Sequence, residues 1–351
     1  MPISRPSTTR TILAADVGGT HARVGIVRAA SMAPHNLELR FYASFECARF
    51  PGLDAILHAF LADHGEIAID GVVVACAGYL DDDRIVNSNL AWPVERTTLV
   101  RALGGRDLAL INDFEALACA LTMPDASGAP LIGGQLTVID APELVIGPGT
   151  GLGAAVRLPG SDGRCQILHT EAGQVSLAPS LPIEIRVLER LLATHAHVNA
   201  ESILSGPGLH TLYTLLAAQR GADAVLDSPA AVSHAAQVAH DPLAIEALEI
   251  FCGLFGSYVG DLVLLYGARG GVYLAGGVLS HIGAFLTQST FHERMVAKGV
   301  MRPILERVPV RMLETGHLGV MGATFWYLQQ RTKSDGATTS DPDLIAPLHA
   351  T

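Results

Sequence analysis

The chain has 351 residues, of which 49% are hydrophobic and 16% are charged. This length and composition exclude a small module held together by disulfides or a metal, and they exclude a largely disordered chain. Acidic residues outnumber basic ones by 34 to 23, and the resulting net charge of −11 gives no reason to expect a nucleic-acid partner or an anionic membrane surface.

The cysteine pattern and the start of the chain indicate a reducing compartment. Five scattered cysteines without a C-x-x-C pair read as buried thiols, namely Cys47, Cys76, Cys119, Cys165 and Cys252. The polar start, and Asp16 within the apolar stretch that follows it, argue against a secretory signal. Every apolar run of about 18 residues contains a charge or a glycine pair. We therefore expect a cytoplasmic protein without a membrane span, ending in a mobile polar tail at 333–351.

In the first part of the chain, β-branched apolar runs alternate with helical patterns, which is typical of an α/β fold. Residues 11–15 and 23–27 are predicted strands joined by a glycine turn. The continuous apolar run 71–77 predicts a central strand that is covered on both faces. A strand at 108–111 is followed by apolar residues at helical spacing over 114–121.

The strand–glycine turn–strand pattern recurs near the middle of the chain, where strands at 144–146 and 154–158 flank the turn 147–153. This recurrence suggests a duplication, with one copy in each of two domains. The second half is more helical. Its predicted elements are helices at 183–194, 201–204, 209–216, 242–265 and 318–329, and strands at 271–275 and 309–312. Three glycines at a spacing of three residues near and on the last helix, Gly316, Gly319 and Gly322, predict close helix packing.

The first candidate site is the early glycine turn, with Asp16, Gly18, Gly19 and Thr20. Paired glycines let backbone amides approach an anion, and Thr20 adds a hydroxyl donor. Asp16 can hold a magnesium ion through the water shell of the ion. A plain tight hairpin would also explain the glycines, but an acid at the end of a packed strand is costly and favours a functional site.

The turn 147–153 is the second candidate. Residues 149–154 fit G-x-G-x-x-A, and Glu171 follows about 20 residues later, as in a dinucleotide-binding site. That fingerprint has to open a helix, whereas the residues after it are predicted as a strand. We therefore favour a loop that presents backbone amides and the Thr150 hydroxyl to a phosphate.

Asn112 and Asp113 form the third candidate, between a predicted strand and a helix, where α/β proteins usually carry chemistry. Asp113 could take the proton from a hydroxyl nucleophile while Asn112 orients the substrate. Asn112 followed by Glu115 three residues later also resembles a capping box. Both interpretations can hold, because capping by Asn112 leaves Asp113 available.

Two further segments complete the candidates. HTEAGQ at 169–174 and the pair Asn199 and Glu201 supply carboxylates and amides, which suit the adjacent hydroxyls of a sugar. The alternatives are an exposed loop acid for Glu171 and a favourable charge in the first turn of a helix for Glu201.

The predicted strand 271–275 ends in Gly276 and Gly277, which offer an open surface for a purine ring. A βα turn without a ligand is the alternative. The histidines show no metal-ligand spacing.

In combination, these segments resemble the bacterial glucokinase family, within the hexokinase–actin-like ATPase superfamily. The similarity runs in order from Ile12 to about Tyr327, and it is carried by LAADVGGTHARVGIV, NSNLAWP, LALINDFEALA, LVIGPGTGLGAA, HTEAGQ, AESILSGPGLHTLY and GGVYLAGGV. The resemblance implies a two-domain actin-like ATPase (ribonuclease H-like) α/β fold with a cleft between a small and a large domain. The implied small domain is 1–112, completed by a C-terminal helix at about 317–331, and the implied large domain is 113–316.

The resemblance also implies a function and a role for each candidate. The implied reaction is phosphoryl transfer from ATP, with Mg²⁺, to the 6-hydroxyl of glucose, by a protein whose family often forms homodimers. Asp113 is the implied catalytic base, and Asn112, Glu171 and Glu201 are implied sugar ligands. The implied cofactor-binding residues are Asp16, Gly18, Gly19, Thr20, Gly149, Thr150, Gly151, Gly276 and Gly277.

Gln174, also expected among the sugar ligands, departs from the family pattern, which commonly has histidine at this position of the E-x-G-H segment. Glutamine donates and accepts hydrogen bonds but carries no charge. The preferred sugar therefore stays open, and a kinase for mannose or an amino sugar and a non-catalytic sugar-sensing regulator are the alternatives. A C-x-C-G-x-x-G-C zinc segment, found in the related repressor and sugar-kinase family, does not occur in the sequence.

Overall fold

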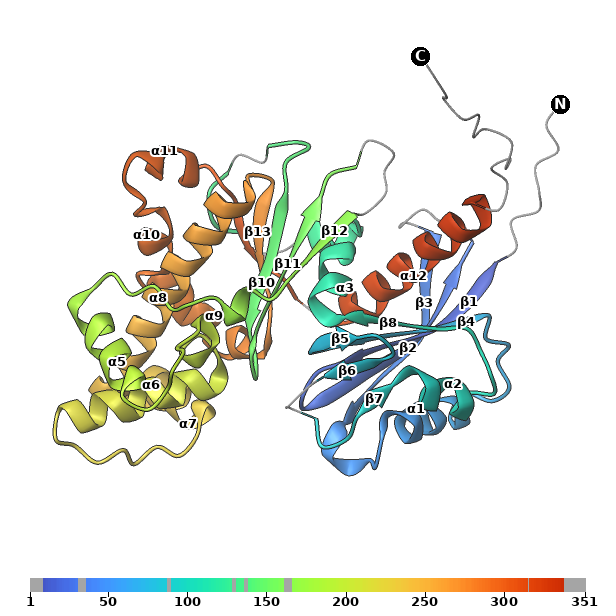
Figure 1. The fold of residues 1–351 in the computed structure, drawn as a ribbon, viewed down its shortest axis with the longest axis horizontal. Coiled ribbons are helices and arrows are strands. Elements are labelled where there is room, and N and C mark those ends of the chain that lie inside the picture. The colour runs from blue at the N-terminus through green and yellow to red at the C-terminus, as the bar shows by residue number, and fades with distance from the viewer. Residues whose placement is uncertain are drawn as a thin grey trace, which may run out of the picture.

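The computed structural model describes residues 9–30, 36–86, 90–127, 131–135, 138–160, 166–314 and 316–337. Two mixed β-sheets lie side by side, with helices on their outer faces and two helices between them (Figure 1). Cys165, residues 87–89 of the NSNLAWP segment and residues 338–351 of the predicted tail lie outside the described residues. The α/β class predicted from the sequence is confirmed.

The first sheet has the strand order β3-β2-β1-β4-β8. Its strands are β1 (Arg10–Val17), β2 (His21–Ala29), β3 (Leu37–Glu46), β4 (Gly71–Cys76) and β8 (Leu108–Asn112). β1 and β2 form the predicted antiparallel hairpin, and β4 and β8 continue the sheet in parallel. β4 is buried along its whole length, as expected of a central strand. Helices α1 (Leu53–Ala62) and α2 (Arg96–Ala102) pack on one face of this sheet.

The second sheet has the strand order β12-β11-β10-β13-β14-β9. Its strands are β9 (Leu131–Gly133), β10 (Glu143–Pro148), β11 (Leu152–Leu158), β12 (Gln166–Thr170), β13 (Gly271–Leu274) and β14 (Val310–Met312). The glycine turn is shorter than predicted, because Gly147 pairs with Gly153 and Pro148 pairs with Leu152 inside the ladder. Three short strands form a separate small sheet next to the first, namely β5 (Tyr79–Asp81), β6 (Arg84–Val86) and β7 (Val94–Glu95).

The second half contains most of the helices. They are α5 (Pro182–Leu192), α6 (Gly206–Gln219), α7 (Pro229–His234), α8 (Pro242–Tyr266), α9 (Gly277–Gln288), α10 (Phe291–Val296) and α11 (Arg302–Leu305). The predicted helix 201–204 is instead a single 3₁₀ turn, Ala200–Ser202. The next helix begins earlier than predicted, because the Ser205 hydroxyl caps it by accepting from the Gly208 amide at 3.0 Å.

Helix α8 is the core of the second half. It is the one helix among the described residues that is long and apolar enough to cross a membrane, a possibility that the sequence argues against. In the structure, 72% of its most apolar window is buried inside the protein, among residues of the neighbouring helices and the sheet. This burial is the environment of a core helix.

Helices α3 (Asp113–Ala120) and α12 (Leu318–Ala337) lie between the two sheets and pack against each other (Figure 1). A Cβ atom at Gly322 would lie 1.9 Å from the Ala116 carbonyl oxygen, so the predicted close packing of the last helix is confirmed. Residues 333–337 continue α12, so the helix extends into the segment predicted as a mobile tail, and its mobility stays a prediction.

The cysteines of the described residues agree with the expected environment. Cys47, Cys76, Cys119 and Cys252 are all buried, and none of them forms a disulfide.

Candidate active site

A cavity of about 1080 Å³ lies between the two sheets. Of the candidate residues named from the sequence, these line it: Asp16, Gly18, Gly19, Thr20, Asn112, Asp113, Gly149, Thr150, Gly151, Glu171, Gln174, Glu201, Gly276 and Gly277. Asn199, the candidate paired with Glu201, does not line the cavity and instead contacts Gln174. The structure thus brings together positions that are up to 261 residues apart, since the set runs from residue 16 to residue 277.

Asp16 stands at the cavity end of β1 and is 7% exposed. Its register partner in the hairpin is Arg23, whose guanidinium lies 3.6 Å from the Asp16 carboxylate. Burial raises the pKa of Asp16, and the charge of Arg23 opposes part of that rise. Gly319 of α12 packs against this carboxylate, because a Cβ there would lie 2.4 Å from Asp16 Oδ2. The last helix therefore has no room for a larger side chain beside Asp16.

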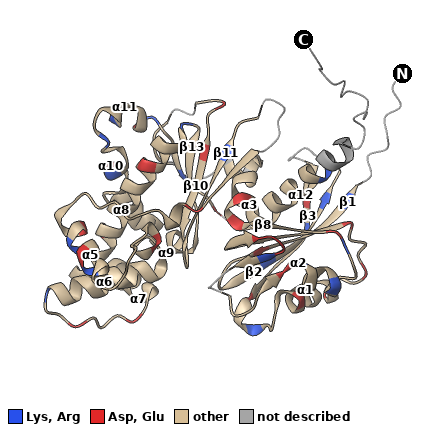
Figure 2. Cartoon of the chain, viewed as in Figure 1, with Lys and Arg blue, Asp and Glu red and all other residues tan. Residues whose placement is uncertain are grey.

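Asp113 is the first residue of α3, a helix on which Figure 2 shows acidic residues in red. Burial raises the pKa of its carboxyl from 3.8 to about 7, and the negative charges of Asp16 and Glu171 add to the rise. A hydrogen bond from the Phe114 amide, at 3.0 Å, acts in the opposite direction. A carboxyl with a pKa near neutral pH is well suited to accept a proton from a hydroxyl group.

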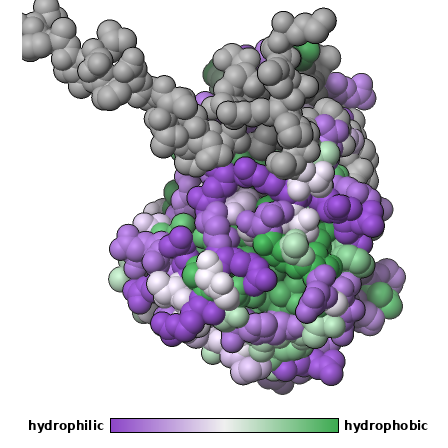
Figure 3. Space-filling model, turned by 90° about the vertical axis from the view of Figure 1, so that its right-hand side faces the viewer, coloured by the Kyte–Doolittle hydropathy of each residue, from purple (hydrophilic) through white to green (hydrophobic). Residues whose placement is uncertain are grey.

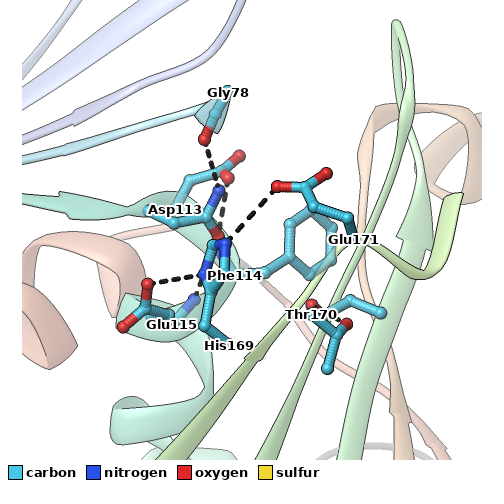
Figure 4. Close-up of polar contacts among 9 residues, drawn as sticks. Gly78, Asp113, Phe114, Glu115, His169, Thr170 and Glu171 are labelled. Atoms are coloured by element: carbon cyan, nitrogen blue, oxygen red, sulfur yellow. Dashed lines mark hydrogen bonds and ion pairs between the residues drawn. The ribbon is translucent and has the colours of Figure 1, made fainter. Parts of the chain in front are cut away.

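Asn112 is the N-cap of α3, as the sequence predicts. Its side-chain oxygen accepts from the amides of Phe114 at 2.8 Å and Glu115 at 3.3 Å. Its amide nitrogen donates to the Gly78 carbonyl at 3.0 Å, a contact drawn in Figure 4. The capping box is only half formed, because the Glu115 carboxylate turns to His169 at 2.8 Å instead of the helix start. Asn112 is thereby fixed in place next to Asp113.

The second glycine loop connects β10 and β11 and is fastened by backbone contacts. The Gly149 amide donates to the Gly151 carbonyl at 2.7 Å, and the Gly206 amide at the start of α6 donates to the Gly149 carbonyl at 2.8 Å. The Leu152 amide donates to Glu201 Oε2 at 2.8 Å. A Cβ at Gly151 would lie 2.5 Å from the same oxygen, so Glu201 holds the loop at close range.

Gln174 connects Asn199 and Glu201 through its side-chain amide. Its side-chain oxygen accepts from the Asn199 amide nitrogen at 2.6 Å, and its side-chain nitrogen donates to Glu201 Oε1 at 3.4 Å. Both functions of the glutamine amide are therefore in use. The side chain is exposed, and it lines the cavity together with Glu171 and Glu201.

Gly276 contributes backbone to the cavity lining. This glycine has φ of +100°, and a Cβ there would lie 2.5 Å from the Pro148 carbonyl oxygen. Gly277 begins α9 and has open space around it, since a Cβ at this position would meet no heavy atom within 4 Å. Pro229 and Ser233 of α7 also line the cavity.

Sequence reasoning missed Arg23, Pro229 and Ser233, which line this cavity, and His169, which does not line it but contacts Glu171. Arg23 could have been found from the hairpin register, because a two-residue turn at Gly19 and Thr20 places it opposite Asp16. Pro229 and Ser233 carry no local signal, since only the packing of α7 against α6 and α8 brings them to the cavity. His169, which contacts both Glu115 and Glu171, lies inside the HTEAGQ segment, whose pattern gives it no role of its own.

Comparison with known proteins agrees with this geometry. The family model described as Glucokinase matches residues 13–330. A glucokinase-like protein of Xylella fastidiosa strain 9a5c is 42% identical over 320 residues, covering 91% of this chain and 95% of that protein. The glucokinase of Paramagnetospirillum magneticum is 35% identical and covers 86% of this chain and 92% of its own length.

A solved structure gives the same result for the fold. The crystal structure of a glucokinase from an Antarctic psychrotroph superimposes with a TM-score of 0.78 at 31% identity, covering 91% of this chain and 99% of that one. The match of the family model runs through both sheets and through α12. The chain described here therefore belongs to the glucokinase family.

Proposed function

We propose that this protein is an ATP-dependent glucose kinase, which transfers the γ-phosphoryl group of ATP to the 6-hydroxyl of glucose. The observation that carries the proposal is the single cavity lined by all the predicted sugar-binding and phosphate-binding residues, with Asp113 among them. Membership of the glucokinase family supports the choice of glucose. The products are glucose 6-phosphate and ADP, which makes the reaction a first step of glycolysis.

Asp113 is the proposed general base. The oxygen of the sugar 6-hydroxyl forms a bond to the γ-phosphorus, and the bond from that phosphorus to the β,γ-bridging oxygen breaks. The hydroxyl proton passes to the Asp113 carboxylate, and ADP leaves with the bridging oxygen. The pKa of about 7 supports this role, because a substantial fraction of the base is then ionised at neutral pH and is basic enough to accept the proton.

The sugar would be held by Asn112, Glu171, Gln174 and Glu201. These side chains supply amide donors and carboxylate acceptors from three separate elements, an arrangement that suits several hydroxyl groups pointing in different directions. Glu201 would serve twice, since one of its oxygens already holds the Leu152 amide of the second glycine loop. Sugar binding and the phosphate loop would in this way be coupled through one carboxylate.

The phosphates would be held by the two glycine loops, at Gly18–Thr20 in the first half and Gly149–Gly151 in the second. Among the described residues no group of three His, Cys, Asp or Glu side chains could hold a metal ion. The buried carboxylate of Asp16 fits Mg²⁺, which typically uses one or two carboxylates together with water and substrate phosphates. When bound, Mg²⁺ neutralises charge on the phosphates. Gly276 and Gly277 would receive the adenosine.

We further propose that 1–112 with α12 form a small domain, that 113–316 form a large domain, and that these close around the sugar. The cavity between the two sheets supports this, because each sheet supplies one phosphate loop and both loops must reach one triphosphate. Closure would exclude water from the phosphoryl group. Saturating glucose should reduce the radius of gyration in solution scattering and slow proteolysis; unchanged scattering and cleavage would rule closure out.

The test of the function is a coupled assay of ADP formation with a panel of hexoses: glucose, mannose and glucosamine. We expect glucose to give the highest kcat/KM. Gln174 is the observation that keeps a second hexose in view, because it stands where the family commonly has histidine. Preference for mannose or glucosamine would replace glucose as the substrate, and hexose binding without ADP formation would identify a sugar-sensing regulator.

The proposal includes a cytoplasmic location and a homodimer. In support of an association surface, hydrophobic residues gather in the middle of the face shown in Figure 3, bordered by hydrophilic ones. Light scattering on the purified protein should give twice the mass of the 36.8 kDa chain. A mass of one chain at micromolar concentration would exclude the homodimer.

A further inference from the structure

The imidazole of His169, on β12, bridges two carboxylates that come from different elements (Figure 4). Its Nδ1 lies 2.8 Å from Glu115 Oε1, on the first turn of α3. Its Nε2 lies 3.4 Å from Glu171 Oε1, directly after β12. The side chain is one-third exposed and lies near the ring of Tyr79, with the ring centroids 6.4 Å apart.

Both ring nitrogens therefore face acceptors. A carboxylate oxygen can only accept a hydrogen bond when ionised, so each nitrogen has to carry a hydrogen to bond its partner. An imidazole that carries a hydrogen on both ring nitrogens is positively charged, and such a charge suits two negative neighbours. The positive charge also acts on Glu115, where it opposes the rise in pKa that burial causes.

The bridge matters because His169 gives the exposed Glu171 side chain an ion-pair partner. The Glu171 side chain is 49% exposed, and His169 is the ion-pair partner that the described residues give it. Figure 4 shows its carboxylate pointing towards Asp113, and the negative charge of Glu171 contributes to the raised pKa of Asp113. Without a partner, an exposed glutamate at the start of a 3₁₀ turn would sample several rotamers, and ordering it on binding would cost free energy.

We propose that His169 is a positioning residue: it holds the Glu171 carboxylate in its sugar-facing orientation by anchoring it, through Glu115, to the same helix that begins with Asp113. This inference rests on the proposed function, in which Glu171 is a sugar ligand. The bridge then fixes the distance between a sugar ligand of the second half and the proposed base. His169 itself lies outside the residues that line the cavity and contacts no substrate.

The first experiment is isothermal titration of the full-length protein with glucose and, separately, with a non-hydrolysable ATP analogue. Loss of one hydrogen-bonded contact predicts that His169→Ala weakens glucose binding about 2- to 12-fold. His169→Gln keeps one donor and should fall between wild type and His169→Ala. Affinity for the ATP analogue should stay within about twofold, and in steady-state assays the KM for glucose should change more than kcat.

A matched control is His195→Ala, which removes an exposed histidine just after α5 whose contacts are to Leu191 and Thr194. It should leave the glucose affinity unchanged. A double-mutant cycle with Glu115→Gln tests the anchor, because effects transmitted along one chain of contacts are not additive. Glu115→Gln with His169→Ala should weaken glucose binding no further than His169→Ala alone.

Three results would overturn the inference. His169→Ala could bind glucose as wild type does, it could lose glucose and ATP-analogue affinity equally, or the two substitutions could be fully additive. Circular dichroism and the unfolding temperature identify a variant that has not folded, in which case His169→Gln supplies the comparison. If the hexose panel selects another sugar, the same titrations use that sugar. Failure of wild type to bind any hexose overturns the proposed function as well.

Discussion

The two sheets share one strand order but present different chemistry at their ends. The order β3-β2-β1-β4-β8 of the first corresponds to β12-β11-β10-β13-β14 of the second, with antiparallel and parallel pairs in the same places. The cavity-facing ends of β1 and β8 carry Asp16, Asn112 and Asp113. Gly147 stands at the end of β10, the counterpart of β1, and Gly276 follows β13, the counterpart of β4. At the ends of these four strands the first sheet thus supplies polar and charged side chains and the second supplies glycine backbone. The second half also brings carboxylates to the cavity, with Glu171 directly after β12 and Glu201 in the 3₁₀ turn Ala200–Ser202.

The helices between the sheets extend this correspondence. α3 follows the first sheet but packs on the second, whereas α12 follows the second sheet and packs on the first. Each half therefore sends one helix across to the other. The shared strand order thus determines where the strand ends of the two sheets meet. The residue types at those ends determine which chemical groups each sheet contributes to the cavity. The shared order agrees with the duplication that the recurring hairpins suggest.

The largest effect is expected at Asp113, because there a single side-chain charge carries the proposed chemistry. Asp113→Asn should lower kcat by about 10²–10⁴-fold while glucose affinity is retained, because general-base help is lost and the shape is kept. Steady-state kinetics and titration with glucose measure the two quantities. The matched control is Asp83→Asn, an exposed carboxylate paired with Arg96 outside the cavity. A variant that retained most of the wild-type kcat would remove Asp113 from the chemistry.

The same substitution has a consequence for stability. Because the pKa of Asp113 is raised in the folded state, the folded protein binds more protons than the unfolded chain between pH 3.8 and about 7. Stability from this group is therefore lost as the pH rises through that window. Asp113→Asn should raise the unfolding temperature at pH 8 and leave it nearly unchanged at pH 3.8 or below.

The second prediction concerns pH dependence in the wild type. If Asp113 accepts the proton, log kcat/KM should rise with pH and level off above about 7, since only the ionised carboxylate acts as a base. Below that point the rate should fall about tenfold for each pH unit, as expected of a single ionisation. Gly276→Ala and Gly277→Ala change no charge and should leave the midpoint unchanged. A profile flat between pH 5 and 8 would assign the base to another group.

Much of this fold could be predicted from local pattern. The strands β1, β2, β4, β8, β10 and β11 are predictable because continuous or paired apolar runs are local properties of the sequence. The sequence prediction omits β3, although its sequence LELRFYASFE alternates apolar with mostly polar residues and its apolar face is half-buried against the core. This alternation is the local signal that could have found the strand. The predicted start of α6 is too late, since Gly206 and Pro207 look like a break until Ser205 is recognised as the cap.

The candidate site shows the limit of local reasoning more sharply. Each motif is visible alone, but that the turn at Asp16 and the turn at Gly149 face one cavity is a property of how two sheets meet. The resemblance to a family suggests that meeting, and the residues themselves do not. The bridge from Glu115 to His169 spans 54 residues, and the contact of Gln174 with Asn199 spans 25. No periodicity or spacing rule reports such contacts.

The third prediction compares alanine substitutions at Gly276 and Gly277, the two glycines that follow β13. Gly276→Ala adds a Cβ at φ of +100° and 2.5 Å from the Pro148 carbonyl oxygen, so it should destabilise the protein by about 1–3 kcal/mol and raise the KM for ATP. Gly277→Ala meets open space and should leave the unfolding temperature unchanged. Any effect of Gly277→Ala would then be confined to the KM for ATP. Equal unfolding temperatures for the two variants would contradict the requirement for glycine at position 276.

The smallest effect is expected at Gln174, which belongs to neither set of strand ends. Its amide accepts from Asn199 at 2.6 Å and donates to Glu201 at 3.4 Å, so it holds two neighbours that would otherwise have to order on sugar binding. Neutral histidine also has one donor and one acceptor, although at different positions. Gln174→His should therefore be tolerated, and Gln174→Ala should lose both contacts.

Because these contacts are remote from the reacting oxygen, they stabilise the ground state and the transition state about equally, and the KM for glucose should change more than kcat. One hydrogen bond corresponds to about 2- to 12-fold in affinity, so Gln174→Ala should raise the KM by at least that range and Gln174→His by less. Steady-state kinetics with glucose and mannose measure both. If neither variant changes the KM for either sugar, Gln174 lies outside the sugar site, and its departure from the family pattern has no bearing on sugar preference. If Gln174→His gains activity that the wild type lacks, the protein is a regulator that has kept Asp16 and Asp113 without the reaction.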